Sequence, residues 1–379
     1  MKTIVVAGHV CLDLIPAFPK LAASLDTLLV PGKLVEVGPT VIATGGAVAN
    51  TGLALHRLGM PVRLVAKVGD DAFGRTVREM FRDAGAPTDG LLIDPAAATS
   101  YSVVLSPAGY DRIFLHCPSA NDRFGAADLT PEMLAGASLL HFGYPSLMKR
   151  MYAGNGAELH ALLLHAKKAW LTTSLDLSLP DPQTPAGQAD WRSILSRVLP
   201  QVDVFVPSLD ELVYMLDRPR SEAMRLPGAR DIPLGGLSVA EVQKVADHAL
   251  DLGAAMVLIK LGSDGVYLQT TRDLSRLQAC GAAAPDPVAW HDVSCYATCF
   301  EVEVAGTTGA GDCTIAGFLA ALVRGLPPDD AVRMAVAVGA ASVEKPDATS
   351  GVRPWDDLAA HMAAGWKRHA PRVTFPRRV

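Results

Sequence analysis

The chain has 379 residues, of which 50% are hydrophobic and 19% are charged, and its formal net charge at pH 7 is −5. This composition excludes a disordered or fibrous chain and indicates a sizeable core. The mildly acidic balance argues against a nucleic-acid-binding surface, because such surfaces concentrate positive charge.

The first third of the chain predicts short strands with a helix among them. Short apolar or β-branched runs bounded by turn residues are typical of strands. The Gly45-Gly46 pair opens a stretch of helical composition that ends at Gly59. In chain order we expect a buried strand over residues 3–7, strands of a half-exposed sheet over 34–43, a helix over 47–58, a strand over 62–68, and a hairpin of strands over 100–105 and 112–117.

From about residue 130 onward, predicted strands alternate with predicted helices. Such alternation implies crossover connections and a mostly parallel sheet. The earlier strands do not fit that sheet, so we expect an accessory sheet laid over one of its ends. The predicted strands are 139–142, 173–177, 202–206 and 256–259, the predicted helices are 158–169 and 237–252, and two irregular insertions are expected over 217–236 and 279–299.

The sharpest chemical signal is the run 306–313, Gly-Thr-Thr-Gly-Ala-Gly-Asp-Cys. We expect a strand over 299–304 before it and a helix over 314–323 after it. A glycine-rich turn at a helix N-terminus points backbone N–H groups outward and favours an anion. Asp312 would lie beside that anion site, kept ionised by the local positive potential. A carboxylate there can accept a hydroxyl proton while the turn holds a transferring phosphoryl group.

Other readings of this run are weaker. A tight strand-to-helix turn with Asp312 as an N-terminal cap would account for a bare Gly-x-Gly, but the full string favours function. No Gly-Lys-Ser/Thr follows, so the run is not a Walker loop. Thr314 stands where the dinucleotide fingerprint has its third glycine, so the run is not that fingerprint either.

Together with further motifs, this run resembles the ribokinase (PfkB) family of carbohydrate kinases. The N-terminal half contributes Gly-Gly-Ala-Val-Ala-Asn at 45–50, Arg-Leu-Gly at 57–59 and Gly-Asp-Asp-Ala-Phe-Gly at 69–74. Ala-Asn-Asp at 120–122 and Lys-Leu-Gly-Ser-Asp-Gly-Val at 260–266 add to it. The resemblance runs from about residue 3 to residue 355 and so covers nearly the whole chain.

The resemblance implies a single ribokinase-like α/β domain over residues 1–379, whereas length alone also allows two or three domains. Its fold would be a doubly wound, mainly parallel nine-stranded sheet flanked by helices. A small β-sheet lid would draw its strands from about 10–44 and 98–118. The implied activity is transfer of the ATP γ-phosphate to a hydroxyl of a sugar or sugar-like substrate. The implied base is Asp312, and the backbone of Gly309, Ala310 and Gly311 would form the anion hole.

The resemblance also assigns the sugar contacts. Asp13 follows the first strand, where open α/β sheets place ligands, and Asn50 lies one helical turn beyond Gly46. A turn aspartate, a helix-interior asparagine and an Asx turn are the structural alternatives for Asp13, Asn50 and Asn121. The implied sugar-binding residues are Asp13, Gly45, Gly46, Asn50 and Asn121.

For the nucleotide, Glu211 matches the Glu of the family's Asn-x-x-Glu motif and is implied to hold Mg²⁺ through water, as a hard oxygen ligand. A surface carboxylate, an ordinary turn at 260–265 and core packing at 336–339 are the structural alternatives. The implied ATP-binding residues are Ser208, Lys260, Gly262, Gly265, Thr307, Val336 and Gly339.

The chain departs from the family pattern at two positions. Gly306 stands where the family usually has an Asp that often belongs to a monovalent-cation site, so a potassium requirement stays open. Ser208 stands where Asn is usual, which predicts a rearranged Mg²⁺ or phosphate contact. The spacing of His291, Cys295 and Cys299 allows a metal site, but without a paired Cys-x2-Cys we favour buried packing residues.

Three other functions and one assembly stay open. A nucleoside kinase or a sugar-phosphate kinase would use the same machinery. A catalytically weak sugar or nucleotide sensor would have no need of Asp312, so that residue favours an enzyme. A lone small sheet leaves edges and apolar area uncovered, which predicts a homodimer through the lid.

The cysteines and the N-terminus bear on the cellular compartment. The six cysteines are sparse and mostly irregularly spaced, unlike a secreted disulfide framework. The apolar run at 4–6 is too short for a signal-peptide core. No stretch of about 18 uncharged apolar residues is present. The sequence therefore predicts a cytoplasmic protein with neither a membrane nor a nucleic acid as partner.

Overall fold

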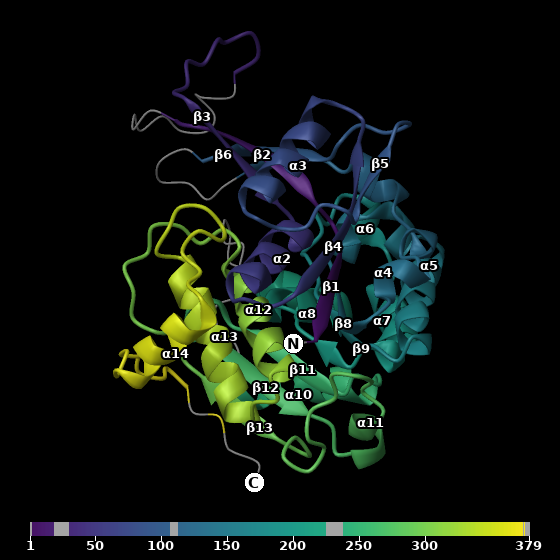
Figure 1. The fold of residues 1–379 in the computed structure, drawn as a ribbon, viewed down its shortest axis with the longest axis vertical. Helices are drawn as coiled ribbons and strands as arrows, with labels where there is room; N and C mark the ends of the chain where they lie inside the picture. Colours follow the sequence, from purple (N-terminus) through teal and green to yellow (C-terminus); the bar gives the residue numbers. More distant parts are fainter. Residues whose placement is uncertain (1, 19–29, 107–112, 225–237, 374, 376–379) are drawn as a thin grey trace.

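The computed structural model describes residues 2–18, 30–106, 113–224, 238–373 and 375 (Figure 1). In these residues, one large sheet of nine strands has the order β13-β12-β11-β10-β9-β8-β1-β4-β5. Neighbouring strands are parallel except at one edge, where β12 pairs antiparallel with β11 and β13. The strands are β1 (Thr3–Gly8), β4 (Val62–Gly69), β5 (Leu91–Asp94), β8 (Ala137–Gly143), β9 (Thr172–Leu175), β10 (Val204–Phe205), β11 (Met256–Lys260), β12 (Val266–Thr270) and β13 (Ser294–Ala297).

Helices cover both faces of this sheet. Both faces of each strand are therefore buried, which is why successive residues along the strands are apolar. In β1, Ile4 and Val6 pack into one core cluster, whereas Val5 and Ala7 pack into a second cluster on the other face. On the first face lie α2 (Ala47–Arg57), α3 (Ala72–Asp83), α11 (Leu274–Gln278), α12 (Ala310–Val323), α13 (Pro328–Ser342) and α14 (Trp355–Ala363). On the second lie α4 (Pro131–Leu134), α5 (Lys149–Lys168), α7 (Trp191–Val198), α8 (Leu209–Leu216) and α10 (Val239–Asp251), while α6 (Pro185–Gln188) and α9 (Arg218–Met224) are short connecting helices. The predicted doubly wound α/β fold is confirmed.

A second, small sheet, the lid, lies beyond the carboxyl ends of the parallel strands, at the top of Figure 1. Its described strands have the order β3-β2-β6-β7. They are β2 (Cys11–Pro16), β3 (Thr40–Gly45), β6 (Tyr101–Leu105) and β7 (Ile113–Cys117). The β6–β7 pair is the predicted hairpin, whose turn at 107–110 lies outside the described residues. Because two residues separate β1 from β2, the lid is joined directly to an interior strand of the large sheet.

Three predicted elements differ from the structure. Of the run 34–43, only the part from Thr40 onward is a strand, because Gly38 and Pro39 interrupt the ladder. Residues 299–304 are not a strand either. The chain leaves the sheet after Ala297, and Val302 and Val304 instead line a cavity. The edge strand of the sheet before the glycine-rich run is instead β13, which lies within the stretch 279–299 that was predicted to be an irregular insertion.

One predicted helix and one predicted insertion also differ from the structure. The helix predicted over 158–169 belongs to α5, which begins at Lys149 and contains a non-helical stretch from Ala153 to Gly156. The other predicted insertion, 217–236, contains the helix α9, and its residues from 225 lie outside the described part. No helix in the described ranges is long and apolar enough to cross a membrane.

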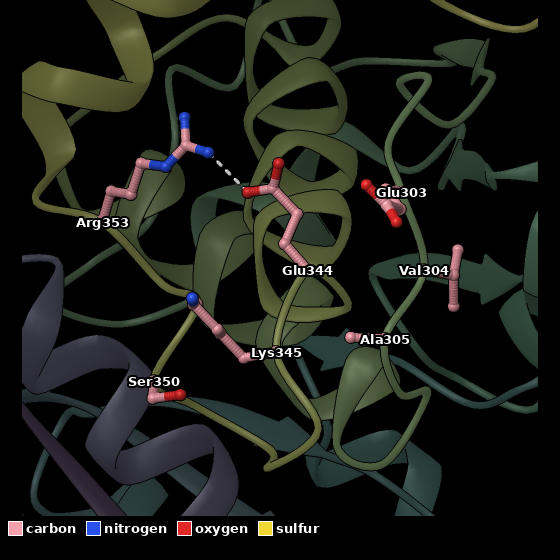
Figure 2. Close-up of a pocket in the computed structure, with 8 residues that line it drawn as sticks. Glu303, Val304, Ala305, Glu344, Lys345, Ser350 and Arg353 are labelled. Carbon is pink, nitrogen blue, oxygen red and sulfur yellow. Dashed lines mark hydrogen bonds and ion pairs between the residues drawn. The ribbon is translucent and has the colours of Figure 1, made fainter.

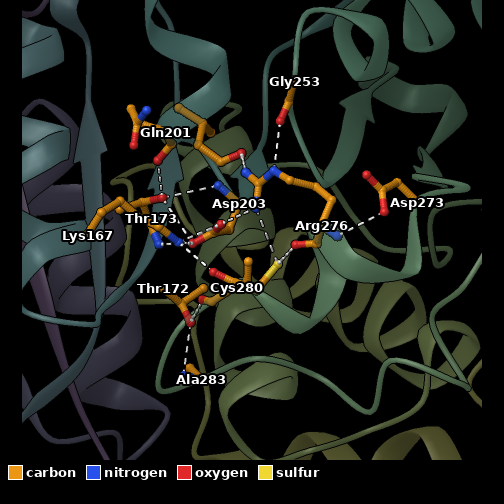
Figure 3. A network of polar contacts seen from close by, with 12 residues as sticks. Lys167, Thr172, Thr173, Gln201, Asp203, Gly253, Asp273, Arg276, Cys280 and Ala283 are labelled. Atoms are coloured by element: carbon orange, nitrogen blue, oxygen red, sulfur yellow. Dashed lines mark hydrogen bonds and ion pairs between the residues drawn. The ribbon is translucent and has the colours of Figure 1, made fainter.

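A polar network on Asp203 ties the strands together at the edge away from the lid (Figure 3). Asp203 directly precedes β10, and none of its side chain is exposed. Its carboxylate accepts hydrogen bonds from Lys167 Nζ at 2.8 Å and Arg276 Nη1 at 2.7 Å. The backbone N–H of Thr173 donates to it at 2.9 Å. One carboxylate therefore joins the ends of α5, β9 and α11.

We predict that Asp203→Ala lowers the free energy of unfolding by about 3–5 kcal/mol, because it leaves Lys167 and Arg276 buried beside no countercharge. Urea denaturation measures this loss. The control is Asp330→Ala, since Asp330 pairs with Arg333 at 3.6 Å on an exposed helix surface. That change should cost less than about 1 kcal/mol. Equal losses in the two variants would contradict a structural role for the network.

Candidate active site

Asp312 lies in the first turn of α12, whose N-terminal cap, Gly309, has a left-handed φ of 71°. A side chain at Gly309 would also collide with Ala348. Only 4% of Asp312 is exposed. From α2, Asn50 Nδ2 donates to its Oδ2 at 3.0 Å and Thr51 Oγ1 donates to its Oδ1 at 3.3 Å. The structure therefore brings Asn50 and Asp312 together, with the asparagine amide on the carboxylate itself.

Burial raises the pKa of the Asp312 carboxyl above the ordinary aspartate range. Hydrogen bonds from Asn50, Tyr144 and Thr51 and the charge of Lys260 lower that pKa, but they do not outweigh burial. The sequence predicted that local positive potential keeps Asp312 ionised, and the charge of Lys260 acts in that direction. A carboxylate with a raised pKa is the stronger base, which suits it to accept a hydroxyl proton.

Lys260, the last residue of β11, carries a positive charge to the start of α12. Its Nζ donates to Asp176 Oδ1 at 2.7 Å, and both side chains are almost entirely buried. A Cβ built on Gly311 would lie 3.5–3.8 Å from Lys260 Cδ, Cε and Nζ. Burial lowers the pKa of Lys260, but the nearby carboxylates, Asp176 foremost, outweigh it and raise that pKa. The ammonium group therefore stays charged beside the glycine-rich turn.

Ser208 and Glu211, predicted to contact phosphate and Mg²⁺, form the N-terminal cap of α8. Ser208 Oγ accepts a hydrogen bond from the Glu211 N–H at 3.2 Å, and Glu211 Oε2 accepts from the Ser208 N–H at 2.6 Å. Ser208 forms a parallel bridge with Lys260, so the cap stands beside the lysine. In the described ranges, no group of three or more His, Cys, Asp or Glu side chains is placed to hold a metal ion.

A cavity of about 1000 Å³ connects these groups. Its wall includes Asp312, the 309–311 turn, and Val336, Gly339 and Ala340 of α13. Every residue that the sequence assigned to the nucleotide, the metal, the base or the anion hole lines it, namely Ser208, Glu211, Lys260, Gly262, Gly265, Thr307, Gly309, Ala310, Gly311, Asp312, Val336 and Gly339.

On the lid side, Asp13 of β2 lies against the Gly45-Gly46 turn. Its carboxylate would overlap with any Cβ at Gly45, so a glycine is needed for this close approach. The Cys11 thiol donates to Asp13 Oδ1 at 3.3 Å. Asn121 is fully buried, and its Nδ2 donates to the Val10 carbonyl at 2.8 Å. The asparagine thus fixes the link between β1 and β2.

Sequence reasoning missed several side chains here. Tyr144 and Asp176 each directly follow a strand, β8 and β9, at the edge where α/β sheets bind ligands, and that position was the available signal. His9, after β1, lies with its Nε2 3.3 Å from Nε2 of His116 in the lid. Burial lowers the pKa of both imidazoles, which keeps them neutral. His9 Nδ1 is buried without a hydrogen-bond partner in the described part of the chain.

A second hollow, of about 580 Å³, is lined by residues 303–305, just before Gly306, and by Glu344, Lys345, Ser350, Gly351 and Arg353 (Figure 2). The Glu344–Arg353 ion pair, at 2.5 Å, spans part of its wall. A Cβ at Gly306 would lie 2.9–3.0 Å from the Pro346 backbone, so the turn is packed tightly where the family usually has Asp. His291, Cys295 and Cys299, whose spacing allowed a metal site, have other surroundings. His291 contacts the Arg272 carbonyl, Cys299 contacts the Gly262 carbonyl, and Cys295 is buried.

Comparison with known proteins agrees with this geometry. A sequence profile described as "pfkB family carbohydrate kinase" matches residues 1–355. Fructokinase-1 of Oryza sativa subsp. japonica is 31% identical over 205 residues, which are 54% of this chain and 62% of that protein. The 2-dehydro-3-deoxygluconokinase of Thermoproteus tenax is 26% identical over 314 residues, 82% of each chain.

Among solved structures, a fructokinase with bound ATP from Xylella fastidiosa superimposes with a TM-score of 0.71. It is 20% identical and covers 96% of this chain and 98% of its own, which shows a shared fold. The profile match, the fold and the arrangement around Asp312 lead to the same conclusion: this chain belongs to the pfkB family of carbohydrate kinases.

Proposed function

We propose that this protein is an ATP-dependent kinase that phosphorylates a hydroxyl of a sugar or sugar-like substrate. The observation that carries the proposal is the position of Asp312 in the wall of the large cavity. It is buried at the N-terminus of α12, next to the backbone of 309–311 and near Lys260. The part of the cavity walled by Val336, Gly339 and Ala340 of α13 is lined by small and apolar residues, which suits an adenine ring.

The chemistry follows from these positions. The acceptor hydroxyl gives its proton to the Asp312 carboxylate, and its oxygen forms a bond to the γ-phosphorus. The bond between that phosphorus and the bridging oxygen of ADP breaks, and ADP leaves with the bonding electrons. Backbone N–H groups of 309–311 and the Lys260 ammonium stabilise the charge on the phosphoryl oxygens. Closure of the lid would keep water from the phosphoryl group.

Magnesium fits the donor chemistry of the site. Glu211 and Asp176 supply hard carboxylate oxygens in the cavity, and Mg²⁺ prefers such ligands together with water and phosphates. Glu211 would contact an ion carried by ATP through water. When bound, Mg²⁺ neutralises phosphate charge.

We further propose a ketose or keto sugar acid as the acceptor. Two of the relatives compared above are named a fructokinase and a 2-dehydro-3-deoxygluconokinase. The lid offers a carboxylate, Asp13, and a neutral imidazole, His116, and His9 beside it adds a second neutral imidazole; all three suit hydroxyl groups.

ADP release with Mg²⁺-ATP tests the function across D-fructose, 2-dehydro-3-deoxygluconate, other sugars, sugar phosphates and nucleosides. We expect turnover with a keto sugar or its acid. Turnover with nucleosides alone would replace the proposal by a nucleoside kinase. Binding of ATP and a sugar by calorimetry with no turnover on any compound would indicate a sensor.

The lid is the proposed dimer interface, because it exposes apolar side chains on its outer strands. Val41 and Ile42 of β3 and Leu115 of β7 are 59%, 49% and 56% exposed. We predict a homodimer by light scattering that Leu115→Glu converts to a monomer. The control is Val288→Glu, since Val288 is 79% exposed outside the lid. A wild-type monomer at micromolar concentration, or equal dissociation by both variants, would refute this interface.

The thiols support the proposed cytoplasmic location. None of the six cysteines forms a disulfide, and four of them are buried. Free thiols persist in a reducing compartment, where disulfides are rare.

A further inference from the structure

Tyr144 has an unusual backbone for a large side chain. It directly follows β8 and has φ 65° and ψ 46°, in the left-handed region. Bulky residues rarely adopt this conformation, and where they do the surrounding structure enforces it, often at functional sites. Here Pro145 begins a short 3₁₀ turn immediately afterwards. The strained turn at the end of the strand holds the phenol ring at the base.

The phenol oxygen contacts both oxygens of the Asp312 carboxylate. It lies 2.9 Å from Oδ1 and 2.8 Å from Oδ2, so its single O–H donates to both. With Asn50 and Thr51, each carboxylate oxygen accepts two hydrogen bonds. These distances are those at which a general base takes the proton of a hydroxyl. The Asp312 carboxylate is therefore already hydrogen-bonded to a hydroxyl group that the protein itself supplies.

We propose that the Tyr144 hydroxyl stands in for the acceptor hydroxyl, occupying Asp312 until the sugar displaces it. The proposal rests on the function proposed above for Asp312. While the phenol is in place, no water can donate to the carboxylate from this position. The enzyme is thereby protected from ATP hydrolysis, in which water would form the bond to the γ-phosphorus and give Asp312 its proton.

The route of displacement runs toward the lid. The His9 ring lies 5.9 Å from the Tyr144 ring, centre to centre, and contacts it at a tilt. The same His9 touches His116 of β7 through the 3.3 Å contact between their Nε2 atoms. A lid that moves over an entering sugar therefore shifts a side chain packed on the tyrosine.

A proton relay through Tyr144 is the competing role, and it has opposite consequences. Burial, with the charges of Asp312 and Asp176, raises the pKa of the phenol well above its ordinary value, so the group stays a neutral donor. In a relay the hydroxyl would be needed for every turnover. As a stand-in it competes with the substrate, and its removal makes sugar binding easier.

The test is Tyr144→Phe, which removes the hydroxyl and keeps the ring. The space left beside Asp312 accommodates a water molecule that can donate to the carboxylate. We expect ATP hydrolysis without sugar to rise by about tenfold or more. We expect the KM and the calorimetric Kd of the sugar to fall by about tenfold, with kcat within about threefold of wild type. Because water is a weaker hydrogen-bond donor than a phenol, the pKa of the base also rises, so the acid limb of the kcat/KM profile moves to higher pH.

Tyr152→Phe is the matched control, because Tyr152 lies on α5 and its ring packs on Trp191. It should leave all these quantities unchanged. A fall in kcat by about 10²-fold or more in Tyr144→Phe would overturn the proposal in favour of a relay. Unchanged hydrolysis, binding and pH profile with a lower melting temperature would reduce Tyr144 to a structural role.

The two proposals fail in different ways. If wild type phosphorylates no sugar, the proposed function fails. ATP hydrolysis by Tyr144→Phe against Tyr152→Phe then still decides whether the phenol shields the carboxylate. If sugar is phosphorylated but the two variants behave alike, the kinase stands and the role of Tyr144 is refuted.

Discussion

Replacing Asp312 by Asn is expected to lower kcat for sugar phosphorylation by about 10³-fold, within the usual range for loss of a general base. Asn has the same shape but accepts no proton at neutral pH. Because burial raises the pKa of Asp312, the native fold bears a cost for its charge, so the variant should be at least as stable as wild type. ATP binding by calorimetry should persist.

The pH dependence of kcat/KM in the wild-type enzyme is a second test of Asp312 as the base. Protonated Asp312 cannot accept a proton, so kcat/KM falls as the pH drops through its pKa. Since that pKa is raised, the loss should begin at a higher pH than for an exposed aspartate. Asp330→Asn, on an exposed helix surface, is the control. Retention of more than about a tenth of wild-type kcat by Asp312→Asn would contradict its role as base.

Lys260→Met is the change with the next largest expected effect. It removes the ammonium group beside Gly311 and keeps an unbranched apolar side chain. We expect kcat to fall by about 10²–10³-fold, because a preorganised charge no longer stabilises the transferring phosphoryl group. The KM for ATP should rise as well. Steady-state kinetics with varied ATP measures both.

Stability must be separated from catalysis at this position, because Lys260→Met leaves the Asp176 carboxylate buried without its partner at 2.7 Å. The double variant Lys260→Met with Asp176→Asn removes both charges and should recover the melting temperature. It should not recover kcat. Recovery of both would show that Lys260 serves only to neutralise Asp176.

Much of the architecture could be predicted because its causes are local. Apolar runs at regular spacing indicate buried parallel strands, and the glycine-rich run before Asp312 predicts the turn at the start of α12, where the structure places it. The strand expected over 299–304 was wrong for a tertiary reason. Its valines face a cavity, and β12 takes its edge partner from the residues just before.

The partners of the base could not be predicted, because they depend on how distant elements meet. Asn50, Thr51 and Tyr144 approach Asp312 from two other elements, more than 160 residues away. The helix cap formed by Ser208 and Glu211 was likewise not predicted, although a serine three residues before a glutamate is a known pattern at the start of helices.

The most direct test of the central claim follows the phosphate itself. Wild type and Asp312→Asn are incubated with ATP that carries a radioactive γ-phosphate and with the sugar that gives the highest ADP release. We predict that label appears in the sugar, in a one-to-one ratio with ADP, and that the variant transfers about 10³-fold less. Label found only in inorganic phosphate, or equal transfer by the two proteins, would contradict the account.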